Sequence, residues 1–223
     1  MNVQSIDNIE TRQSAVTAAR AEVIERLQTG ALSPGQRIVT SELAQELELS
    51  RGPVREALHI LAGEGVVELL PNKGARIRPI GEKDILDGLT LLSALGGLAI
   101  YLGTELMSDT RCRKLMQERL DNVAKALASR NAMRFYQALQ EFHYSLHGIV
   151  DNFSLSIAFA HLHMEYFNRT LAATLPGDHW EQFEANYQEI GKHLLAGHSE
   201  KARLAYQKHM TWAIDLIKKE GTG

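Results

Sequence analysis

The chain has 223 residues, of which 44% are hydrophobic and 23% are charged. These values are ordinary for a globular protein and exclude a disordered, collagen-like or low-complexity chain. The 24 Lys and Arg residues face 27 Asp and Glu residues, so the formal net charge at pH 7 is -3. This slightly acidic total neither indicates nor excludes a nucleic-acid partner, because attraction depends on where the charges sit.

Three features bear on where the chain works. Its single cysteine, Cys112, cannot form an internal disulfide, which fits a reducing compartment. Residues 1–13 are polar and show no secretory signal pattern. The 17 residues 88–104 carry no charge, but they include four glycines and fall short of the roughly 20 apolar residues of a membrane span. We therefore expect a cytoplasmic protein with a buried helix at 88–104 and no membrane contact.

The composition changes near residue 80. Four of the five prolines lie before this point, and eight of the nine histidines lie after it. Pro79-Ile80-Gly81 is a natural joint, because Pro ends a strand pattern and Gly precedes a new helical one. We predict an N-terminal extension over 1–14, a first domain over 15–80 and a second domain over 81–223.

The first domain reads as two helices, a turn, a third helix and a hairpin. The predicted elements are a helix over 15–27, a turn at 33–35, an extended piece at 37–39, a helix capped by Thr40 and reaching Leu47, a helix over 51–64 capped by Ser50, and a hairpin with strands 66–70 and 75–78. This order is typical of a winged helix-turn-helix.

From residue 82 onward the pattern is helical throughout. The predicted helices cover 83–107, 109–129, 131–150, 153–174, 179–196 and 199–219. The fold class is therefore mostly α, with a winged helix-turn-helix followed by an all-α helical bundle.

The third helix has the chemistry of a DNA-reading helix. Arg51, Arg55 and His59 recur every four residues and form a polar stripe. Arginine near the start of such a helix can reach guanine edges or grip phosphate. Gly52 leaves room for a phosphate, and the Ser50 hydroxyl can contact the DNA backbone.

The hairpin turn supplies a wing for the same surface. Asn72, Lys73 and Gly74 form its tip, and Arg76 follows on the returning strand. The alternative interpretation is that the two arginines are solvated surface residues, with Arg55 paired to a neighbouring glutamate. The convergence of helix, cap and wing in this order favours DNA contact.

These segments resemble the DNA-binding domain of GntR-type bacterial transcription regulators. The resemblance rests on Ser33-Pro-Gly-Gln-Arg-Ile38, Leu49-Ser-Arg-Gly-Pro-Val-Arg-Glu-Ala-Leu58 and Asn72-Lys-Gly-Ala75. It implies that Ser50, Arg51 and Arg55 are recognition-helix contacts and that Lys73 and Gly74 lie at the wing tip. It also implies a homodimer on a palindromic operator.

The second domain is similar to the FCD ligand-binding domain of the FadR branch of that family. The similarity rests on Glu141-Phe-His143, on Asp151-Asn152, and on Ala196-Gly197 with His209 beyond. Typical members hold a divalent metal of the Zn, Ni or Mn class with an Asp one turn before the first His and two further His residues. Here His143 and His209 remain as uncertain metal ligands, but the other two positions are Leu139 and Tyr187.

The resemblance also implies a small-molecule effector. We expect His143, His147, Arg169, Tyr187 and His209 to line its site. The branch usually carries an Arg and a Glu where this chain has Leu92 and Gly96, so the effector is either a small organic acid or a less charged metabolite. The expected function is an effector-responsive transcription regulator, most simply a repressor that a small metabolite releases from its operator.

Two alternatives stay open. The first is a DNA-binding dimer of the same fold that has lost effector or metal sensing. The second is a small helical enzyme, which the sequence disfavours because it has no Gly-rich phosphate loop, no His-Glu-x-x-His and no Gly-x-Ser-x-Gly.

Overall fold

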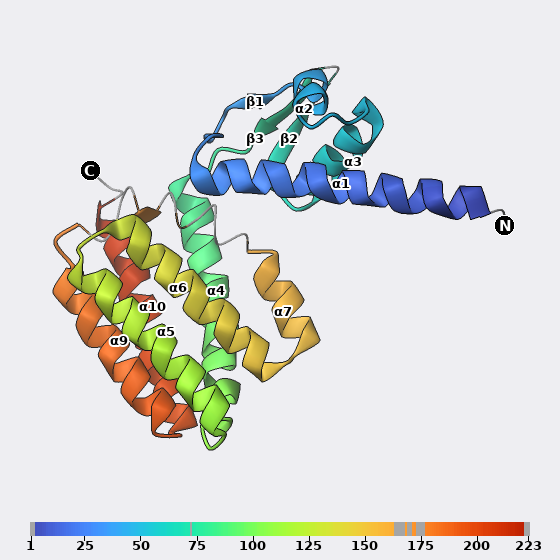
Figure 1. Ribbon diagram of the computed structural model, residues 1–223. Helices are drawn as coiled ribbons and strands as arrows, with labels where there is room; N and C mark the ends of the chain where they lie inside the picture. The colour runs from blue at the N-terminus through green and yellow to red at the C-terminus, as the bar shows by residue number, and fades with distance from the viewer. Residues whose placement is uncertain (1–2, 72, 163–167, 169–170, 173–176, 221–223) are drawn as a thin grey trace. The chain divides into compact units, whose positions relative to one another are not determined.

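The computed structural model describes residues 3–71, 73–162, 168, 171–172 and 177–220. It divides into two compact units, Met1–Ile80 and Gly81–Gly223. Both are mostly helical, and only the first contains strands in the described part of the chain (Figure 1).

Three helices build the first unit. They are α1 (Val3–Thr29), α2 (Thr40–Glu46) and α3 (Arg51–Gly63). The apolar residues Val16, Ala19, Val23 and Leu27 of α1 are buried, which agrees with their helical spacing. The helix predicted over 15–27 begins earlier, at Val3, so the predicted extension over 1–14 is helical from that residue onward. Polar residues continue the helix there, and Arg12 Nη2 donates to Glu56 Oε2 of α3 at 2.8 Å.

Ion pairs fix α1 to the other two helices. The Arg20 guanidinium donates to both carboxylate oxygens of Glu64, just after α3. Arg26 Nη1 donates to Glu46 Oε2 of α2 at 2.7 Å. These charge-assisted bonds link α1 to α2 and to the end of α3, in addition to the buried apolar residues of α1.

A three-stranded antiparallel sheet completes the first unit. Its strands are β1 (Arg37–Ile38), β2 (Val67–Leu70) and β3 (Gly74–Ile77), in the order β1-β3-β2. The sequence predicts the β2–β3 hairpin, but it gives 37–39 only as an extended piece. In the structure Arg37 pairs with Arg76 and Ile38 pairs with Ala75, so β1 is an edge strand of the wing.

The two helix caps differ from expectation. Val39, not Thr40, is the N-cap of α2, and Thr40 is its first helical residue. Ser50 does occupy the N-cap of α3, but its hydroxyl makes no hydrogen bond to the helix. That hydroxyl is therefore free to meet a partner outside the chain.

The second unit is a helical bundle. Its described helices are α4 (Glu82–Glu105), α5 (Thr110–Ala128), α6 (Ala132–Val150), α7 (Phe153–Ala160), α9 (Trp180–Leu195) and α10 (Ser199–Glu220). Five of them agree closely with the sequence. The single helix predicted over 153–174 is interrupted, because α7 ends at Ala160 and a turn follows at His161-Leu162, while the described residues Asn168, Leu171 and Ala172 are again helical.

The first helix of the bundle packs most extensively on the last. Gly96 of α4 lies so close to Tyr206 of α10 that a Cβ on Gly96 would fall 2.4 Å from the Tyr206 hydroxyl. By length and composition alone α4 could cross a membrane. Its buried side includes Ile85, Leu92 and Ile100, which belong to the core of this unit.

Candidate DNA-binding and effector sites

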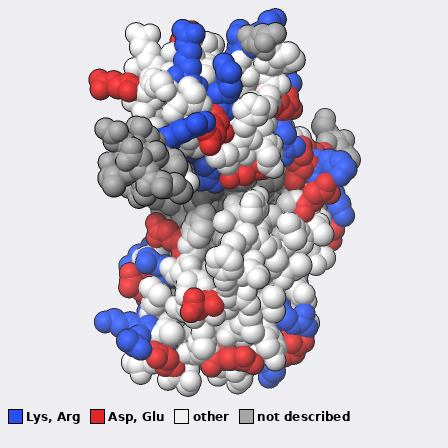
Figure 2. Space-filling view, turned by 90° about the vertical axis from the view of Figure 1, so that its right-hand side faces the viewer, with Lys and Arg blue, Asp and Glu red and all other residues white. Residues whose placement is uncertain are grey.

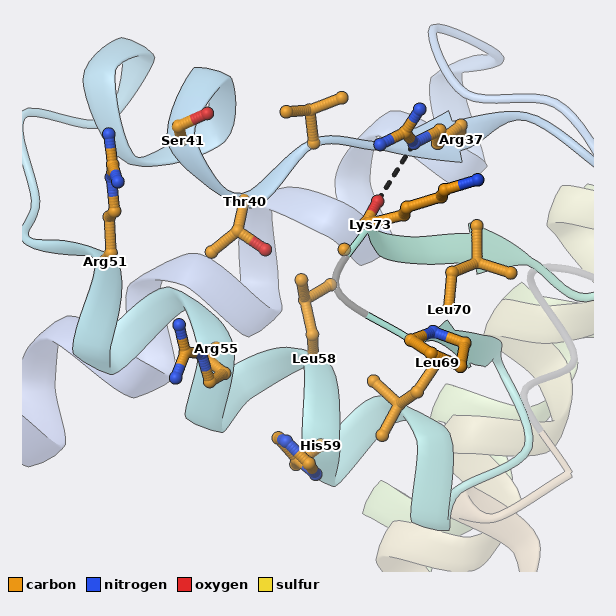
Figure 3. A pocket seen from close by; sticks show the side chains of 13 residues that line it. Arg37, Thr40, Ser41, Arg51, Arg55, Leu58, His59, Leu69, Leu70 and Lys73 are labelled. Carbon is orange, nitrogen blue, oxygen red and sulfur yellow. Dashed lines mark hydrogen bonds between the residues drawn. The ribbon is translucent and has the colours of Figure 1, made fainter.

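A groove of about 600 Å³ runs along the exposed side of α3 in the first unit. Residues of β1, α2, α3 and the hairpin line it (Figure 3). They are Arg37, Val39, Thr40, Ser41, Arg51, Arg55, Leu58, His59, Leu69, Leu70, Pro71, Lys73 and Gly74. We call this the cationic groove, because it holds four Lys or Arg residues and no Asp or Glu among the described residues.

The amphipathic pattern of α3 turns its polar stripe toward this groove. Val54, Ala57, Leu58 and Leu61 are buried against the rest of the unit. Arg51, Arg55 and His59 are exposed on the opposite side, as their spacing predicts. Figure 3 shows these three side chains following one another along the helix.

Ion pairing separates the groove cations from the other arginines of this unit. Arg12, Arg20, Arg26 and Arg76 each pair with a glutamate. Within the described part of the chain, Arg51, Arg55 and Lys73 form no ion pair, and Glu56 pairs with Arg12 instead of Arg55. The unit carries 9 basic and 10 acidic residues, yet four of its basic side chains, none of them in an ion pair within the described part of the chain, line one groove.

The remaining predicted DNA contacts fall into three groups. Ser50 and Gly52 lie exposed at the start of α3, and a Cβ on Gly52 would meet open space. Arg76 does not line the groove, since its guanidinium is held by Glu68 directly across the β2–β3 ladder. Asn72 lies outside the described residues.

Sequence reasoning missed Arg37 as a groove residue. Its Nε donates to the Lys73 backbone oxygen at 2.9 Å, which ties β1 to the wing tip. The pairing of β1 with β3 is what brings Arg37 to the groove. Arg37 is exposed beside the buried Ile38, and it projects from the same sheet as the wing. Thr40 and Ser41 add hydroxyl groups from α2.

Gly74 shapes the wing as well as lining the groove. Its φ is +84°, and a Cβ there would lie 2.2 Å from the Ile38 backbone oxygen. Only glycine permits this backbone conformation and the close approach of β1 at once.

A second cavity lies inside the helical bundle, with a volume of about 50 Å³. It is lined by Leu89, Leu92, Tyr136, Leu139, Gln140, His143, Phe159, Asn168, Leu171, Phe183, Tyr187, His209, Met210 and Ala213. His143, Tyr187 and His209 therefore meet at one place, as the sequence predicts. His147 lies one turn after His143 and contacts the same Phe159 ring, while Arg169 lies outside the described residues.

The histidines of this region are uncharged at neutral pH. Burial, together with His147 and His209, lowers the pKa of His143 to about 3. Burial lowers the pKa of His147 and of His209 to about 4 each. It also raises the pKa of Tyr187, so that its phenol stays protonated.

The three imidazoles differ in how many of their ring nitrogens have a hydrogen-bond partner. His209 Nδ1 lies 3.1 Å from Asn186 Nδ2. His143 Nε2 lies 3.5 Å from the Tyr206 hydroxyl. Neither His143 Nδ1 nor either ring nitrogen of His147 has a partner among the described residues.

The residues present do not fit the metal that the FCD resemblance implies. Over the described ranges, no group of three or more His, Cys, Asp or Glu side chains could hold an ion. Leu139 and Tyr187 line the cavity where the family pattern places a carboxylate and an imidazole. Two imidazoles and a protonated phenol are a poor ligand set for a divalent ion.

A winged helix-turn-helix with a cationic groove, joined to a helical domain with an inner cavity, defines a DNA-binding regulator with a separate sensing domain. Residues 16–77 match the model for bacterial regulatory proteins of the gntR family, and residues 87–211 match the FCD domain. The chain belongs to the GntR family of bacterial regulatory proteins and carries an FCD domain. Proteins of this family are transcription regulators that bind DNA operators, and they are not enzymes.

Relatives and solved structures agree with this membership. A probable D-xylose utilization operon transcriptional repressor of Paenarthrobacter nicotinovorans is 34% identical over 89 residues, which are 40% of this chain and 39% of that protein. The HTH-type transcriptional regulator YdhC of Bacillus subtilis is 24% identical over 75% of this chain and 80% of its own length. The structure of E. coli McbR/YncC has the same fold, with a TM-score of 0.74 and 20% identity over 92% of this chain and 98% of that chain.

Proposed function

We propose that this regulator binds its operator through the cationic groove, with α3 in the major groove and the wing on the neighbouring backbone. The observation that supports the proposal is that Arg37, Arg51, Arg55 and Lys73, which have no glutamate partner in the described part of the chain, all line one groove with α3. Phosphate contacts supply affinity, and arginine at base edges supplies sequence preference.

The arginines and the lysine have different tasks. Arg51 lies in the first turn of α3, where a recognition helix approaches the bases, and Arg55 follows one turn later. Lys73 stands at the wing tip, next to Arg37. Arg51 therefore contributes to the choice of sequence, whereas Lys73 grips phosphate.

A matched pair of variants tests this assignment. Arg51→Ala should weaken operator binding by about 1–3 kcal/mol and relax the sequence preference. Arg76→Ala is the control, because it removes an arginine that Glu68 already holds outside the groove, and it should leave operator binding nearly unchanged. Fluorescence anisotropy with operator DNA measures both. Equal losses for the two variants would contradict the groove as the reading surface.

We further propose that two copies bind a palindromic operator as a homodimer. The second unit carries a broad surface with few charges on the side that holds α7, and most charged side chains there lie toward its edges (Figure 2). Its large exposed apolar residues include Leu91 and Leu98 of α4 and Phe153 and Ile157 of α7. A hollow between the two helices is lined by Leu102, Leu106 and Phe153, with Glu105 and Asp151 at its border. We call Leu91, Leu98, Leu102, Phe153 and Ile157 the uncharged face.

A second copy is the occupant that suits this face. In a two-fold dimer the same surface patch meets itself, so any central charge would oppose its own copy. The segment 88–104 has no charged residue, and neither has 153–160. Two copies also place two recognition helices on successive turns of the duplex.

The regulator is proposed to act in the cytoplasm as a repressor. A small molecule in the bundle cavity would favour an arrangement of the two domains that no longer fits both half-sites. The competing possibility is a dimer that has lost effector sensing. If sensing has been lost, no metabolite or chelator should change the affinity for the operator. The same anisotropy assay measures this affinity.

A further inference from the structure

Two histidines of α6 carry an unusual hydrogen-bond deficit. His143 and His147 lie one turn apart, and each is only 4% exposed. Three of their four ring nitrogens have no partner among the described residues. Native proteins pair nearly all buried polar groups, so three orphaned nitrogens at one place indicate a missing partner.

The deficit is confined to one side of the cavity. His209 lies across it on α10, and its Nδ1 is already 3.1 Å from the Asn186 amide. On the α6 side, the Phe159 ring of α7 lies 5.7 Å from the His143 ring and 4.1 Å from the His147 ring, centroid to centroid. His147 does not itself line the cavity, whereas Phe159, which contacts its ring, does, so access from the cavity to His147 requires the Phe159 ring to move.

The lining residues indicate the chemistry of the missing partner. No Lys, Arg, Asp or Glu is among the described residues around the cavity, and most of its walls are apolar. Among the described residues around the cavity, a buried carboxylate would lose its hydration and find no cation to replace it. A neutral imidazole offers one N–H donor and one bare nitrogen acceptor, which suit a hydroxyl or amide group that both donates and accepts.

We propose that this cavity binds a small uncharged ligand, with an apolar body and hydroxyl or amide groups, through the ring nitrogens of His143 and His147 and without a metal ion. The inference rests on the proposed effector-sensing function, for which it names the ligand class. The cavity volume of about 50 Å³ is far below the roughly 300 Å³ of an ordinary ligand site. Binding therefore requires a very small ligand or a movement of side chains such as Phe159.

The first test needs no ligand. If the ring nitrogens of His147 have no hydrogen-bond partner in the ligand-free protein, His147→Leu should raise the thermal unfolding midpoint of the full chain by roughly 2 °C or more. The reason is that leucine is an apolar side chain of similar size and removes the unpaired groups. His209→Leu is the matched control. It should lower the midpoint, because it leaves the Asn186 amide without its partner. A His147→Leu midpoint lowered as much as that of His209→Leu would overturn the proposal, since the nitrogens would then be satisfied within the folded protein.

The second test uses two probes of the same shape. Isobutyramide is neutral and both donates and accepts hydrogen bonds, whereas isobutyrate is an anion. In NMR titrations of the full chain, isobutyramide should bind at least tenfold more tightly than isobutyrate, and His147→Leu should weaken its binding at least tenfold. No binding of isobutyramide, or tighter binding of isobutyrate, overturns the assigned ligand class.

The third test uses metal ions without an organic ligand. Titration with Zn²⁺, Ni²⁺ or Mn²⁺ should give the same stoichiometry for the wild type and for His143→Leu. A site that disappears in His143→Leu would show that the cavity holds a metal after all. Because none of these measurements involves DNA, their failure and a failure of operator binding are separate results.

Discussion

Lys73 stands at the tip of the wing, where its position is fixed through the backbone. The Arg37 side chain donates to its carbonyl oxygen, and its own amide donates to the Leu70 oxygen at 3.0 Å. The ammonium group is therefore presented from a fixed turn. This arrangement suits a contact with a phosphate, which has the same charge in every sequence.

Loss of Lys73 should weaken binding to all DNA sequences alike. Each neutralised phosphate releases counterions, so Lys73→Ala should make the slope of log affinity against log salt shallower by about 1. Anisotropy titrations at several salt concentrations measure this slope for operator and random DNA. Lys83→Ala, which removes a lysine paired with Asp87 in the second unit, should keep the wild-type slope. A loss confined to the operator would contradict the phosphate role.

The buried histidines should make the second unit sensitive to acid. Their folded pKa values of about 3 to 4 lie below the unfolded value of about 6.5. The unfolded chain therefore binds more protons as the pH falls below about 6.5, and the stability present above that pH is lost progressively toward pH 4. Each histidine contributes up to about 1.4 kcal/mol per pH unit.

Removing one histidine should reduce this acid sensitivity. Urea unfolding of the full chain between pH 7.5 and 5 should show a smaller loss of stability for His147→Leu than for the wild type. His161→Gln removes an exposed imidazole of the same unit and should follow the wild type. Identical pH profiles for all three proteins would contradict a neutral buried His147.

Among the elements, the contact of α4 with α10 depends on one small residue. A Cβ at Gly96 would lie 2.4 Å from the hydroxyl of the fully buried Tyr206. Gly96→Ala should therefore destabilise the second unit by about 1–3 kcal/mol through overpacking. Gly148→Ala on α6 meets open space and should be neutral or stabilising by roughly 0.5 kcal/mol. Chemical denaturation compares the two, and an equally stable Gly96→Ala would show that Tyr206 can move aside.

Elements with a regular apolar period were predictable. The apolar stripe of Val54, Leu58 and Leu61 predicts α3 and its buried side, and the same helical period predicts five of the bundle helices. Elements stabilised by other interactions could not be predicted in this way. The start of α1 is stabilised by Arg12 against Glu56, which lies 44 residues away. The strand β1 consists of two residues that only the pairing with β3 defines.

The candidate site was predictable where a single helix carries it. The stripe Arg51, Arg55 and His59 needs only the helical period. The positions of Arg37 and Arg76 could not be predicted without the strand pairing of the sheet. Their neighbours on the adjacent strands decide which of the two reaches the groove. In the bundle, the departures at Leu139 and Tyr187 were visible in sequence, but the orphaned nitrogens of His147 follow only from its surroundings.

For the whole molecule, the uncharged face should decide the oligomeric state. Leu98 is 46% exposed on α4, and Leu204 is 52% exposed on α10. Leu98→Glu places a charge within the uncharged face, where it would meet its own copy, so it should convert the dimer to a monomer. Leu204→Glu should leave the dimer intact. Sedimentation velocity measures both, and a monomeric wild type, or an unchanged Leu98→Glu dimer, would contradict this interface.

The glutamates beside Arg12, Arg20, Arg26 and Arg76 also shape how the regulator searches a chromosome. Random DNA retains a protein through the number of phosphates it can neutralise. Among the described residues of the first unit, these four arginines are already paired with glutamates, so we expect random sequence to be held mainly by the cations of the groove. Weaker retention by competing genomic sites would leave a larger free pool of the regulator to reach the operator.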